Sequence, residues 1–366
     1  MNVPKLRFKE FSDEWKKAKL SSFVNINPKN NSLPDKFIYI DLESVNNGLL
    51  TSRKIVNKSE APSRAQRTII KNDILYQTVR PYQMNNLFIN SLDSDYPYIA
   101  STGYALLRTK ENPYFVYSIL YQKSFVNKVL DMCTGTSYPA ISANDLGTIS
   151  ICLPSIKEQE KIGKTLSLLD KKIELQTKKI EDLKLFKLSK YSSVFSKSNN
   201  KIKLSDICII EKGKQINSDL LIEKGNYYML NGGILPSGYL NEYNTNENTI
   251  TISEGGNSCG YVNFNKTKFW CGGHCYKIIS SSVNSSYLYH LLKHNEKIIM
   301  DLRVGSGLPN IQKKDLEALK LSIHKNDEQL KIGILFDTFD KKINLETKKL
   351  NKFKELKKAL MQVMFV

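Results

Sequence analysis

The sequence predicts an α+β protein with two similar domains, mixed but rich in β-structure, that are joined by two long helices. We expect these helices to form an antiparallel coiled coil and the chain to have internal pseudo-twofold symmetry. Three observations support this prediction. A Lys-rich helical stretch occurs twice, β-type segments precede each copy, and 366 residues accommodate two domains with connecting helices.

The repeated stretch spans residues 156–195 and 326–365, which align at a constant offset of 170 residues. Self-similarity at so long a period indicates a duplicated domain with its helix, and not a solenoid repeat. The molecule is therefore expected to be a pseudo-dimer within one chain. Identical positions include Glu158/Glu328, Gln159/Gln329, Ile162/Ile332, Gly163/Gly333, Asp170–Ile173/Asp340–Ile343 and Thr177–Lys179/Thr347–Lys349.

Apolar residues in both copies have the spacing of a coiled-coil seam, and most flanking positions are Lys or Glu. No proline interrupts either run, so each helix is expected to be about 55 Å long at roughly 1.5 Å per residue. The seam has a polar gap at Gln176 and at Glu346, and we expect these two residues to face each other at the pseudo-twofold axis. The alternative is that each helix packs separately on its own domain. The predicted seam residues are Ile162, Leu166, Leu169, Ile173, Ile180, Leu183, Ile332, Phe336, Phe339, Ile343, Leu350 and Phe353.

The two helices divide the chain into four expected segments. These are a first domain at 1–155, a central helix at 156–197, a second domain at 198–325 and a C-terminal helix at 326–366.

Short elements are expected inside the first domain. A short helix is predicted around Asp13–Leu20, and residues 113–131 have helical spacing. Clusters of branched and aromatic side chains predict strands between them. These strands are Lys36–Asp41, Thr68–Ile70, Asp73–Val79 and Tyr104–Arg108, with a further strand inside Pro139–Leu153.

The second domain repeats this plan, since Lys201–Ile210 resembles the opening, Asn248–Ser253 the strand at Asp73–Val79, and Ser286–Leu302 the helical stretch at 113–131. At the offset of 170 the similarity reaches back to about residue 101, and Gly305-Ser306-Gly307 stands where Gly135-Thr136-Ser137 stands in the first half.

Upstream the halves diverge, with Val79–Gln83 in one and Glu254–Ser258 in the other. A shared scaffold with a divergent face is expected if the two halves recognise two different targets.

The formal net charge of +18 is spread over both halves, which favours a polyanionic partner, most often nucleic acid. The sequence has no run of eighteen apolar residues and no charged–apolar leader at Met1, so we expect neither a membrane span nor export. Its six cysteines are scattered, which is typical of a reducing cytoplasm.

One arrangement of motifs carries a family resemblance. A β-rich domain, a strand ending in Ile151-Cys152-Leu153-Pro154, and a Glu-Gln-x-Lys-Ile start to a long Lys-rich helix, all repeated once, resemble the specificity subunit of type I restriction–modification systems. The opening Leu6–Phe11 with Trp15, and the stretch from Gly255 to His274, are similar to members of that family as well.

This resemblance implies two target recognition domains, each reading one half of a split DNA site. The two helices would set the unread spacer and help to dock two methyltransferase subunits, which methylate adenine with S-adenosylmethionine. Restriction (translocase) subunits would complete the assembly. The resemblance implies no catalysis and no cofactor on this chain, with S-adenosylmethionine and ATP on partner subunits only. Contacts with two identical partner subunits are expected at Lys171/Lys341, Lys172/Lys342 and Lys178/Lys348.

Long polar and basic side chains in the divergent stretches are the predicted contacts to double-stranded DNA, because Arg pairs with guanine and Asn or Gln with adenine. Two small-residue loops add backbone amides and hydroxyls that suit phosphate, although simple strand-connecting turns would look alike. The first domain contributes Arg53, Arg64, Arg67, Arg80, Tyr82, Gln83, Thr134, Thr136 and Ser137. The second contributes Lys212, Lys214, Gln215, Asn231, Tyr239, Asn257, Ser258, Lys268, Arg303 and Ser306.

Two other functions are weighed against this prediction: a stand-alone DNA methyltransferase or nuclease, and a basic coiled-coil adaptor without sequence specificity. Gly163-Lys164-Thr165 lacks the upstream glycine of a phosphate-binding loop, and Asn112-Pro113-Tyr114-Phe115 lacks the second proline of an adenine methyltransferase motif. Pro113 is expected to begin a helix. Four further residues do not have zinc-site spacing, so we predict buried thiols, a polar turn histidine and no metal. They are Cys259, Cys271, His274 and Cys275.

Overall fold

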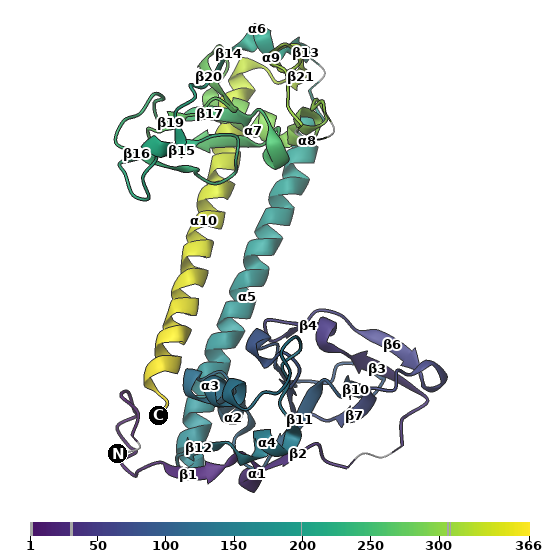
Figure 1. Ribbon diagram of the computed structural model, residues 1–366. Coiled ribbons are helices and arrows are strands. Elements are labelled where there is room, and N and C mark those ends of the chain that lie inside the picture. The colour runs from purple at the N-terminus through teal and green to yellow at the C-terminus, as the bar shows by residue number, and fades with distance from the viewer. Residues whose placement is uncertain (1–2, 30–31, 199, 306, 308) are drawn as a thin grey trace. The chain divides into compact units, whose positions relative to one another are not determined.

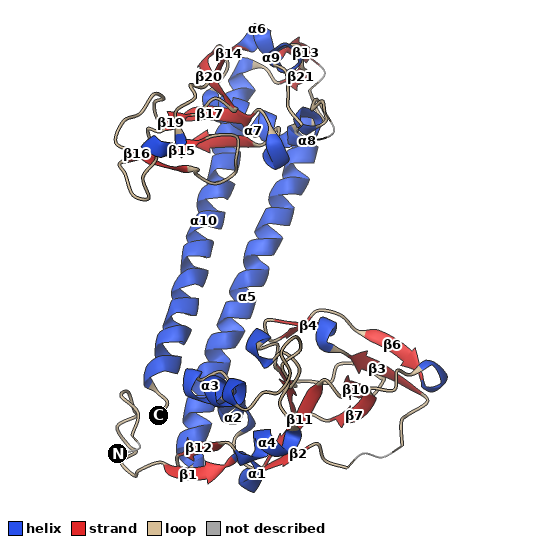
Figure 2. Cartoon of the chain, viewed as in Figure 1, coloured by secondary structure: helices blue, strands red, loops and turns tan. Residues whose placement is uncertain are grey.

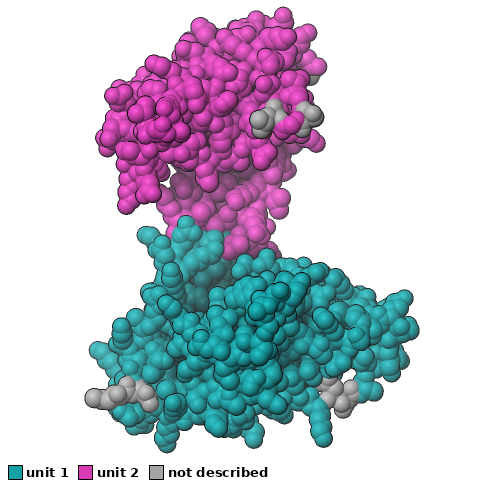
Figure 3. Space-filling view, viewed as in Figure 1, with its two compact units in different colours: residues 1–176, 349–366 teal, residues 177–348 magenta. Residues whose placement is uncertain are grey.

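The structure is a computed structural model of the chain, and it describes residues 3–29, 32–198, 200–305, 307 and 309–366. The chain forms two compact units, residues 1–176 with 349–366 and residues 177–348 (Figure 3). Each unit contains one β-rich domain and a part of each long helix, α5 (Ile156–Phe195) and α10 (Asn326–Val363) (Figure 1). The fold is therefore α+β, as predicted (Figure 2).

The first domain has two four-stranded sheets and a strand pair beside them. One sheet has the order β2-β11-β8-β9 and the other β6-β3-β10-β7, in which β3 and β10 are parallel. Their bounds are β2 (Val24–Ile26), β11 (Tyr104–Thr109), β8 (Ile74–Gln77), β9 (Leu87–Phe88), β6 (Lys54–Asn57), β3 (Lys36–Ile40), β10 (Tyr98–Ser101) and β7 (Ala65–Ile69). The other elements are β1 (Lys16–Lys19) paired with β12 (Ser150–Leu153), the hairpin β4 (Val45–Asn46) and β5 (Leu49–Leu50), and α1 (Leu20–Phe23), α2 (Pro113–Ile119), α3 (Lys123–Asp131), α4 (Ala143–Thr148), η1 (Leu42–Ser44), η2 (Lys58–Glu60) and η3 (Pro81–Gln83).

The second domain repeats this topology. Its four-stranded sheet has the order β14-β20-β17-β18 and its smaller sheet the order β16-β15-β19, again with one parallel pair, β15 and β19. The shared topology thus extends well upstream of the segment in which the two sequences align. The strands are β14 (Cys208–Lys212), β20 (Cys275–Ser281), β17 (Thr249–Ser253), β18 (Val262–Asn265), β16 (Gly238–Leu240), β15 (Tyr227–Leu230), β19 (Trp270–Cys271), and β13 (Asn200–Lys203) paired with β21 (Lys320–Ile323). The helices are α6 (Leu204–Ile207), α7 (Ser285–His294), α8 (Glu296–Met300), α9 (Lys313–Glu317), η4 (Ser218–Leu220) and η5 (Gly256–Ser258).

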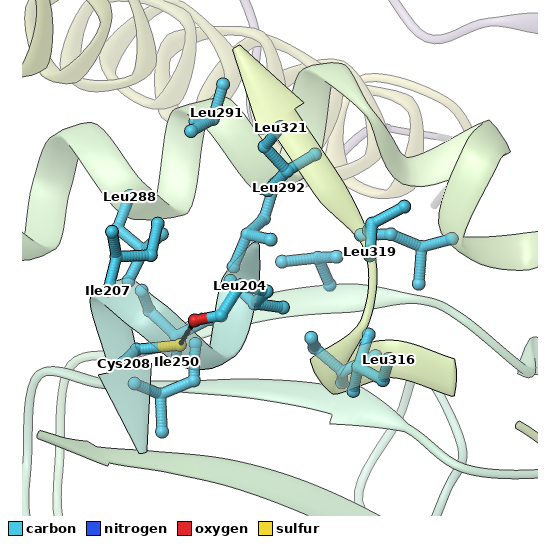
Figure 4. Packing of buried hydrophobic residues seen from close by; sticks show 14 of the residues in the cluster. Leu204, Ile207, Cys208, Ile250, Leu288, Leu291, Leu292, Leu316, Leu319 and Leu321 are labelled. Atoms are coloured by element: carbon cyan, nitrogen blue, oxygen red, sulfur yellow. Dashed lines mark hydrogen bonds between the residues drawn. The ribbon is translucent and has the colours of Figure 1, made fainter. Parts of the chain in front are cut away.

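Each unit has its own hydrophobic core, to which the long helices contribute. In the second unit, Leu288, Leu291 and Leu292 of α7 pack with Leu204 of α6 and Leu321 of β21 (Figure 4). Each such side chain, when fully buried, stabilises the fold by about 1.5–3 kcal/mol relative to an exposed one.

One prediction about a short element is wrong, and another is confirmed with a break in the helix. Residues 13–20 do not form a helix, because Lys16–Lys19 is strand β1, whose register pairs Lys16 with Leu153 of β12. The helical stretch at 113–131 is two helices, α2 and α3, and the stretch at 286–302 is divided in the same way into α7 and α8. Pro113 does begin α2, behind Asn112 as its N-cap.

The glutamine shared by the two repeats closes the turn that leads into each long helix. The Nε2 of Gln159 donates to the carbonyl oxygen of Pro154 at 3.1 Å, and that of Gln329 donates to the carbonyl oxygen of His324 at 3.0 Å. Both glutamine side chains are buried, so these bonds are shielded from water.

The shared glycine lets each long helix approach the start of a domain helix. A Cβ on Gly163 would lie 2.4 Å from the Oδ1 of Asn112, which accepts the Phe115 N–H at 2.9 Å as the N-cap of α2. A Cβ on Gly333 would lie 3.2 Å from the Oδ1 of Asn284, the N-cap of α7. The repeated motif is therefore a joint between helix and domain.

Within each unit the segments of α5 and α10 run antiparallel. In the first unit the Nζ of Lys357 lies 2.6 Å from the carboxylate of Asp170, and in the second the Nζ of Lys187 lies 2.5 Å from that of Asp340. In the second unit Tyr191, one turn after Lys187, packs on Phe336, one turn before Asp340, so residue numbers rise along one helix as they fall along the other.

The predicted seam residues serve both the helix pair and the domains. Ile162 and Leu166 belong to the core of the first domain, and Phe336 belongs to that of the second. That Gln176 and Glu346 face each other stays a prediction. Of the remaining seam residues, Leu169, Ile180 and Leu350 are buried, whereas Ile173, Leu183, Ile332, Phe339, Ile343 and Phe353 are half-buried.

Among the described residues, no helix is long and apolar enough to cross a membrane.

Candidate nucleic-acid interface

In each domain, the strand that carries the divergent stretch ends beside the small-residue loop. After β8 the N–H of Arg80 donates to the carbonyl oxygen of Pro139 at 2.7 Å, and after β17 the N–H of Gly256 donates to that of Pro309 at 3.0 Å. The two predicted recognition segments of each half therefore lie side by side. Arg80 and Gly256 thus occupy corresponding positions in the two domains. The sequence alignment at an offset of 170 residues does not pair them.

A buried glutamine holds the first-domain segment in place. Gln77 is 1% exposed, and its Nε2 donates at 2.8 Å both to the carbonyl oxygen of Val79 and to the Oε1 of Gln83. Its Oε1 accepts the N–H of Asn85 at 3.1 Å. The Oε1 of Gln83 already accepts a hydrogen bond from Gln77. The NH₂ group of this exposed side chain can therefore donate to a ligand.

The segment forms one wall of an open hollow of about 950 Å³ on the first domain. Three of the predicted DNA contacts, Arg64, Arg80 and Gln83, line this hollow together with Asn85 and Tyr138. These side chains come from separate parts of the chain and are mostly donors, and the carboxylate of Glu43 lines the hollow as well. The hollow therefore suits a ligand with several acceptors, such as a base edge or a phosphate.

Arg80 has an unusual backbone in this wall. Its φ is 53° and its ψ is 55°, the left-handed region that glycine tolerates best. Its guanidinium carbon lies 4.3 Å from the centre of the Tyr138 ring. The Nε is buried and has no hydrogen-bond partner among the described residues.

The other first-domain predictions lie outside this wall or at its edge. Arg53 lines a different hollow and pairs with Asp93 at 3.0 Å. Arg67 is half-buried in β7, where burial lowers the pKa of its guanidinium. Tyr82 is exposed on η3, and the loop residues Thr134, Thr136 and Ser137 lie on the surface.

The second domain has a different and smaller hollow, of about 410 Å³, in which the predicted residues Gln215 and Asn231 lie with Met229. The Oδ1 of Asn231 accepts the N–H of His274 at 3.1 Å, so this amide also has its NH₂ left to donate. Lys214, next to Gln215, is exposed.

Two predicted lysines of the second domain already have partners. The Nζ of Lys212 lies 2.6 Å from the carboxylate of Glu254, and the Nζ of Lys268 donates to the hydroxyl of Tyr243 at 3.0 Å. Of the remaining predicted residues, Tyr239, Asn257 and Arg303 lie on the surface, Ser258 is half-buried, and Ser306 lies outside the described residues.

The prediction missed Tyr138 and Glu254. Tyr138 directly follows the predicted loop Thr134–Ser137, and a search for aromatic residues beside small-residue loops would have found it. Glu254 is 9% exposed and accepts hydrogen bonds from Lys212 and from the Tyr276 hydroxyl, which no local pattern signals.

The cysteine and histidine residues weighed as a zinc site are Cys259, Cys271, His274 and Cys275. The three thiols are buried, as predicted, and burial raises the pKa of the Cys259 thiol. His274 is exposed in a turn. Within the described part of the chain, no three Cys, His, Asp or Glu side chains are grouped so that they could hold a metal ion.

The net charge of +18 is typical of nucleic-acid-binding proteins, and the two domains share one fold but carry different hollows. The chain belongs to the family of the type I restriction modification DNA specificity domain, whose sequence model matches residues 12–185 and again 197–355. The two matches correspond to the two repeats of the fold.

Known relatives match a part of the chain. A protein of Mycoplasma pneumoniae that carries the name of a putative type I specificity subunit is 34% identical over 144 residues, which are 38% of this chain and 38% of that protein. The HindI specificity subunit of Haemophilus influenzae is 29% identical over 147 residues, 38% of this chain and 31% of the relative. The matched parts thus span about a third of the length of these relatives.

Two solved structures match all or nearly all of the chain. The S subunit of a type I restriction–modification system from M. genitalium has a TM-score of 0.71 at 20% identity, over 100% of this chain and 99% of that one. A chain from a study of complex assembly in a type I system has a TM-score of 0.56 at 21% identity, over 95% and 96% of the two chains. At these identities the likeness shows the fold.

Proposed function

We propose that the chain is the DNA sequence-specificity subunit of a type I restriction–modification complex, with no catalytic activity of its own. Each domain reads one half of a bipartite site, and the two long helices set the unread spacer. The observation that carries this proposal is that the two domains share one backbone fold but differ in the segment predicted to read DNA. The same strand, turn and loop occur twice, with Arg80 at a position where the other half has Gly256.

The proposed partners are double-stranded DNA, two methyltransferase subunits and the restriction subunits. S-adenosylmethionine and ATP bind to those partner subunits, and we place the assembly in the cytoplasm. Surface charge supports the docking prediction, because all six lysines are exposed on the long helices: Lys171, Lys172, Lys178, Lys341, Lys342 and Lys348. The HindI relative is named as a specificity subunit, which supports the same role for this chain.

Methylome sequencing of cells that express the chain with the methyltransferase subunit of its system tests the proposal. The expected result is adenine methylation at one split motif, which disappears when this chain is omitted. Purified chain incubated alone with S-adenosylmethionine and DNA is expected to transfer no methyl groups. Transfer in the absence of a partner would instead favour the stand-alone methyltransferase.

The basic-adaptor alternative makes a different prediction for binding. An adaptor without specificity binds DNA through phosphates alone, so its affinity would be indifferent to sequence and would fall steeply with salt. The assembled complex is expected to prefer duplexes that carry the methylated motif over duplexes in which both halves are scrambled. Equal affinity for the two duplexes would favour the adaptor.

A further inference from the structure

We propose that Arg80, held against the ring of Tyr138, reads a guanine in the half-site of the first domain, and that the second domain makes no equivalent contact. This inference rests on the proposed function. It specifies which base is read, which side chain reads it and in which half-site. Arg80 is the specificity-determining residue, and Tyr138 is a positioning residue.

The backbone supplies the first argument. Arg80 and Met84, on either side of η3, have φ values of 53° and 52°, and the second domain has Gly256 and Gly260 near the same places, at 74° and 86°. A left-handed backbone is unfavourable for a side chain with a Cβ, whereas glycine adopts it freely. The second domain therefore shows that glycine can occupy this left-handed turn. In the first domain an arginine occupies it, although its Cβ makes the left-handed conformation unfavourable. Strain of this kind is typical of functional sites.

The side chain supplies the second argument. The guanidinium of Arg80 stacks on Tyr138, with 4.3 Å between the guanidinium carbon and the ring centre. No acidic side chain is paired with Arg80 among the described residues, whereas Arg7, Arg53 and Arg108 each have a carboxylate partner. The charge and the donors of Arg80 are therefore not neutralised inside the protein.

Tyr138 can hold this orientation because its loop is fixed. The loop is bonded at both ends, with the N–H of Thr134 donating to the carbonyl of Ala140 at 2.9 Å and the reverse bond also at 2.9 Å. Gly135 turns the chain at a φ of 91°, where a Cβ would lie 3.1 Å from the carbonyl oxygen of Tyr138. The ring is thus a preformed platform, although it is 65% exposed.

The chemistry of the hollow points to guanine. A guanidinium offers two parallel N–H groups, which match the O6 and N7 acceptors of guanine in the major groove. A side chain that is already stacked loses less conformational freedom when it binds, because its orientation is set beforehand. Gln83 lies in the same hollow with its NH₂ available, so it can donate to a neighbouring acceptor.

The reconstituted complex of this chain with its methyltransferase subunit provides the test. Duplex affinity is measured for each single base-pair change in the methylated motif, and over a range of salt concentrations. Four variants are compared with the natural chain: Arg80→Lys, Arg80→Gly, Tyr138→Phe and Tyr138→Ala. Arg80→Lys keeps the positive charge and removes the two parallel N–H groups. Arg80→Gly introduces the residue that the second domain has at this position and removes the strain of the left-handed backbone.

The expected result is confined to one base pair. Both Arg80 variants should lose discrimination at one guanine of one half-site, by about 10-fold or more, which is within the range of a bidentate contact. Tyr138→Ala should lose part of that discrimination and Tyr138→Phe should keep it, because the ring remains. Binding to the other half-site should not change.

The controls distinguish base reading from phosphate contact and from loss of stability. Arg108→Lys weakens an ion pair with Asp73 outside the hollow, so it reports on stability loss without a change of base preference. If Arg80 contacts phosphate instead, the variants weaken all duplexes equally and lower the salt slope by about one. That result, or unchanged base preference in well-folded Arg80→Gly, overturns the inference. Absence of any split motif with the natural chain would count against the proposed function itself.

Discussion

The glycine shared by the two long helices has no Cβ, and this lets each helix lie close to a domain. Gly163 lies so close to Asn112 that a Cβ would be 2.4 Å from its side-chain oxygen and 3.2 Å from the backbone nitrogen of Phe115. At Gly333 the corresponding contacts are 3.1 Å and longer. The first joint is therefore tighter than the second.

Gly163→Ala is accordingly expected to destabilise the chain more than Gly333→Ala. A glycine-to-alanine change inside a helix is intrinsically favourable by about 1 kcal/mol, but overpacking typically costs about 1–3 kcal/mol. At Gly163 the Asn112 cap must move, so the packing effect prevails. Thermal unfolding of both variants of the full chain measures the order. A higher midpoint for Gly163→Ala than for the natural chain would show that the joint is loose.

A buried histidine makes the second unit sensitive to pH. His290 is 0% exposed, its Nδ1 lies 2.8 Å from the Tyr191 hydroxyl, and its Nε2 lies 3.1 Å from the Asp337 carboxylate. Burial lowers its pKa from the usual 6.5, although Asp337 acts in the opposite direction. His294, on the next turn of α7, also has a pKa lowered by burial.

The sign of the pH effect follows from linkage. Because the folded-state pKa of His290 is depressed, the unfolded chain binds the proton first as the pH falls below about 6.5, and stability is lost in that window. His290→Gln should flatten the decline of the unfolding midpoint between about pH 7.5 and 5.5, even if the midpoint itself is lower. The natural chain, measured over the same pH range, serves as the reference for the slope. An unaltered slope in His290→Gln would assign the decline to other groups.

The long helices could be predicted almost completely, whereas the short elements could not. The period of apolar residues along α5 and α10 is a local signal that persists over about ten turns. Strand β1 has no such signal, because its identity comes from pairing with β12, more than one hundred residues away in the chain. The break between α2 and α3 is similar, since apolar spacing continues through Leu120 and both helices pack into the same core.

The unbroken course of α5 gives a prediction about the spacer. Four residues inserted beside Gln176 lengthen a helix by about 6 Å at roughly 1.5 Å per residue, which is nearly two base pairs at about 3.4 Å each. The methylated motif should keep both half-sites and gain unread positions between them, as methylome sequencing would reveal.

The same four residues inserted between Ser196 and Lys197 provide the control. That point lies beyond the end of α5 at Phe195, so the helix keeps its length and the motif should not change. A spacer that is identical in both insertion variants would contradict the role of α5 as a ruler.

The site was less predictable than the frame that carries it. Arg80 and Gln83 could be found as polar residues in a divergent stretch, but the hollow that collects them depends on a loop more than fifty residues away. Arg80 lies against the ring of Tyr138, and the hydrogen bond from the Arg80 N–H to the carbonyl of Pro139 joins these two distant segments. Contacts between distant segments leave no periodic trace in a sequence.

The division of the chain into two repeats predicts that its specificity is modular. Residues 1–140 include the first-domain sheets, the Arg80 segment and the loop up to Ala140, but no part of α5 or α10. Exchange of this segment for the corresponding segment of a relative should therefore replace one half of the methylated motif and leave the other half and the spacer intact. The reciprocal exchange of residues 200–310 should replace the opposite half. Methylomes of the two chimaeras report both outcomes in one experiment, and a chimaera in which both halves change would show that the two domains read DNA as one unit.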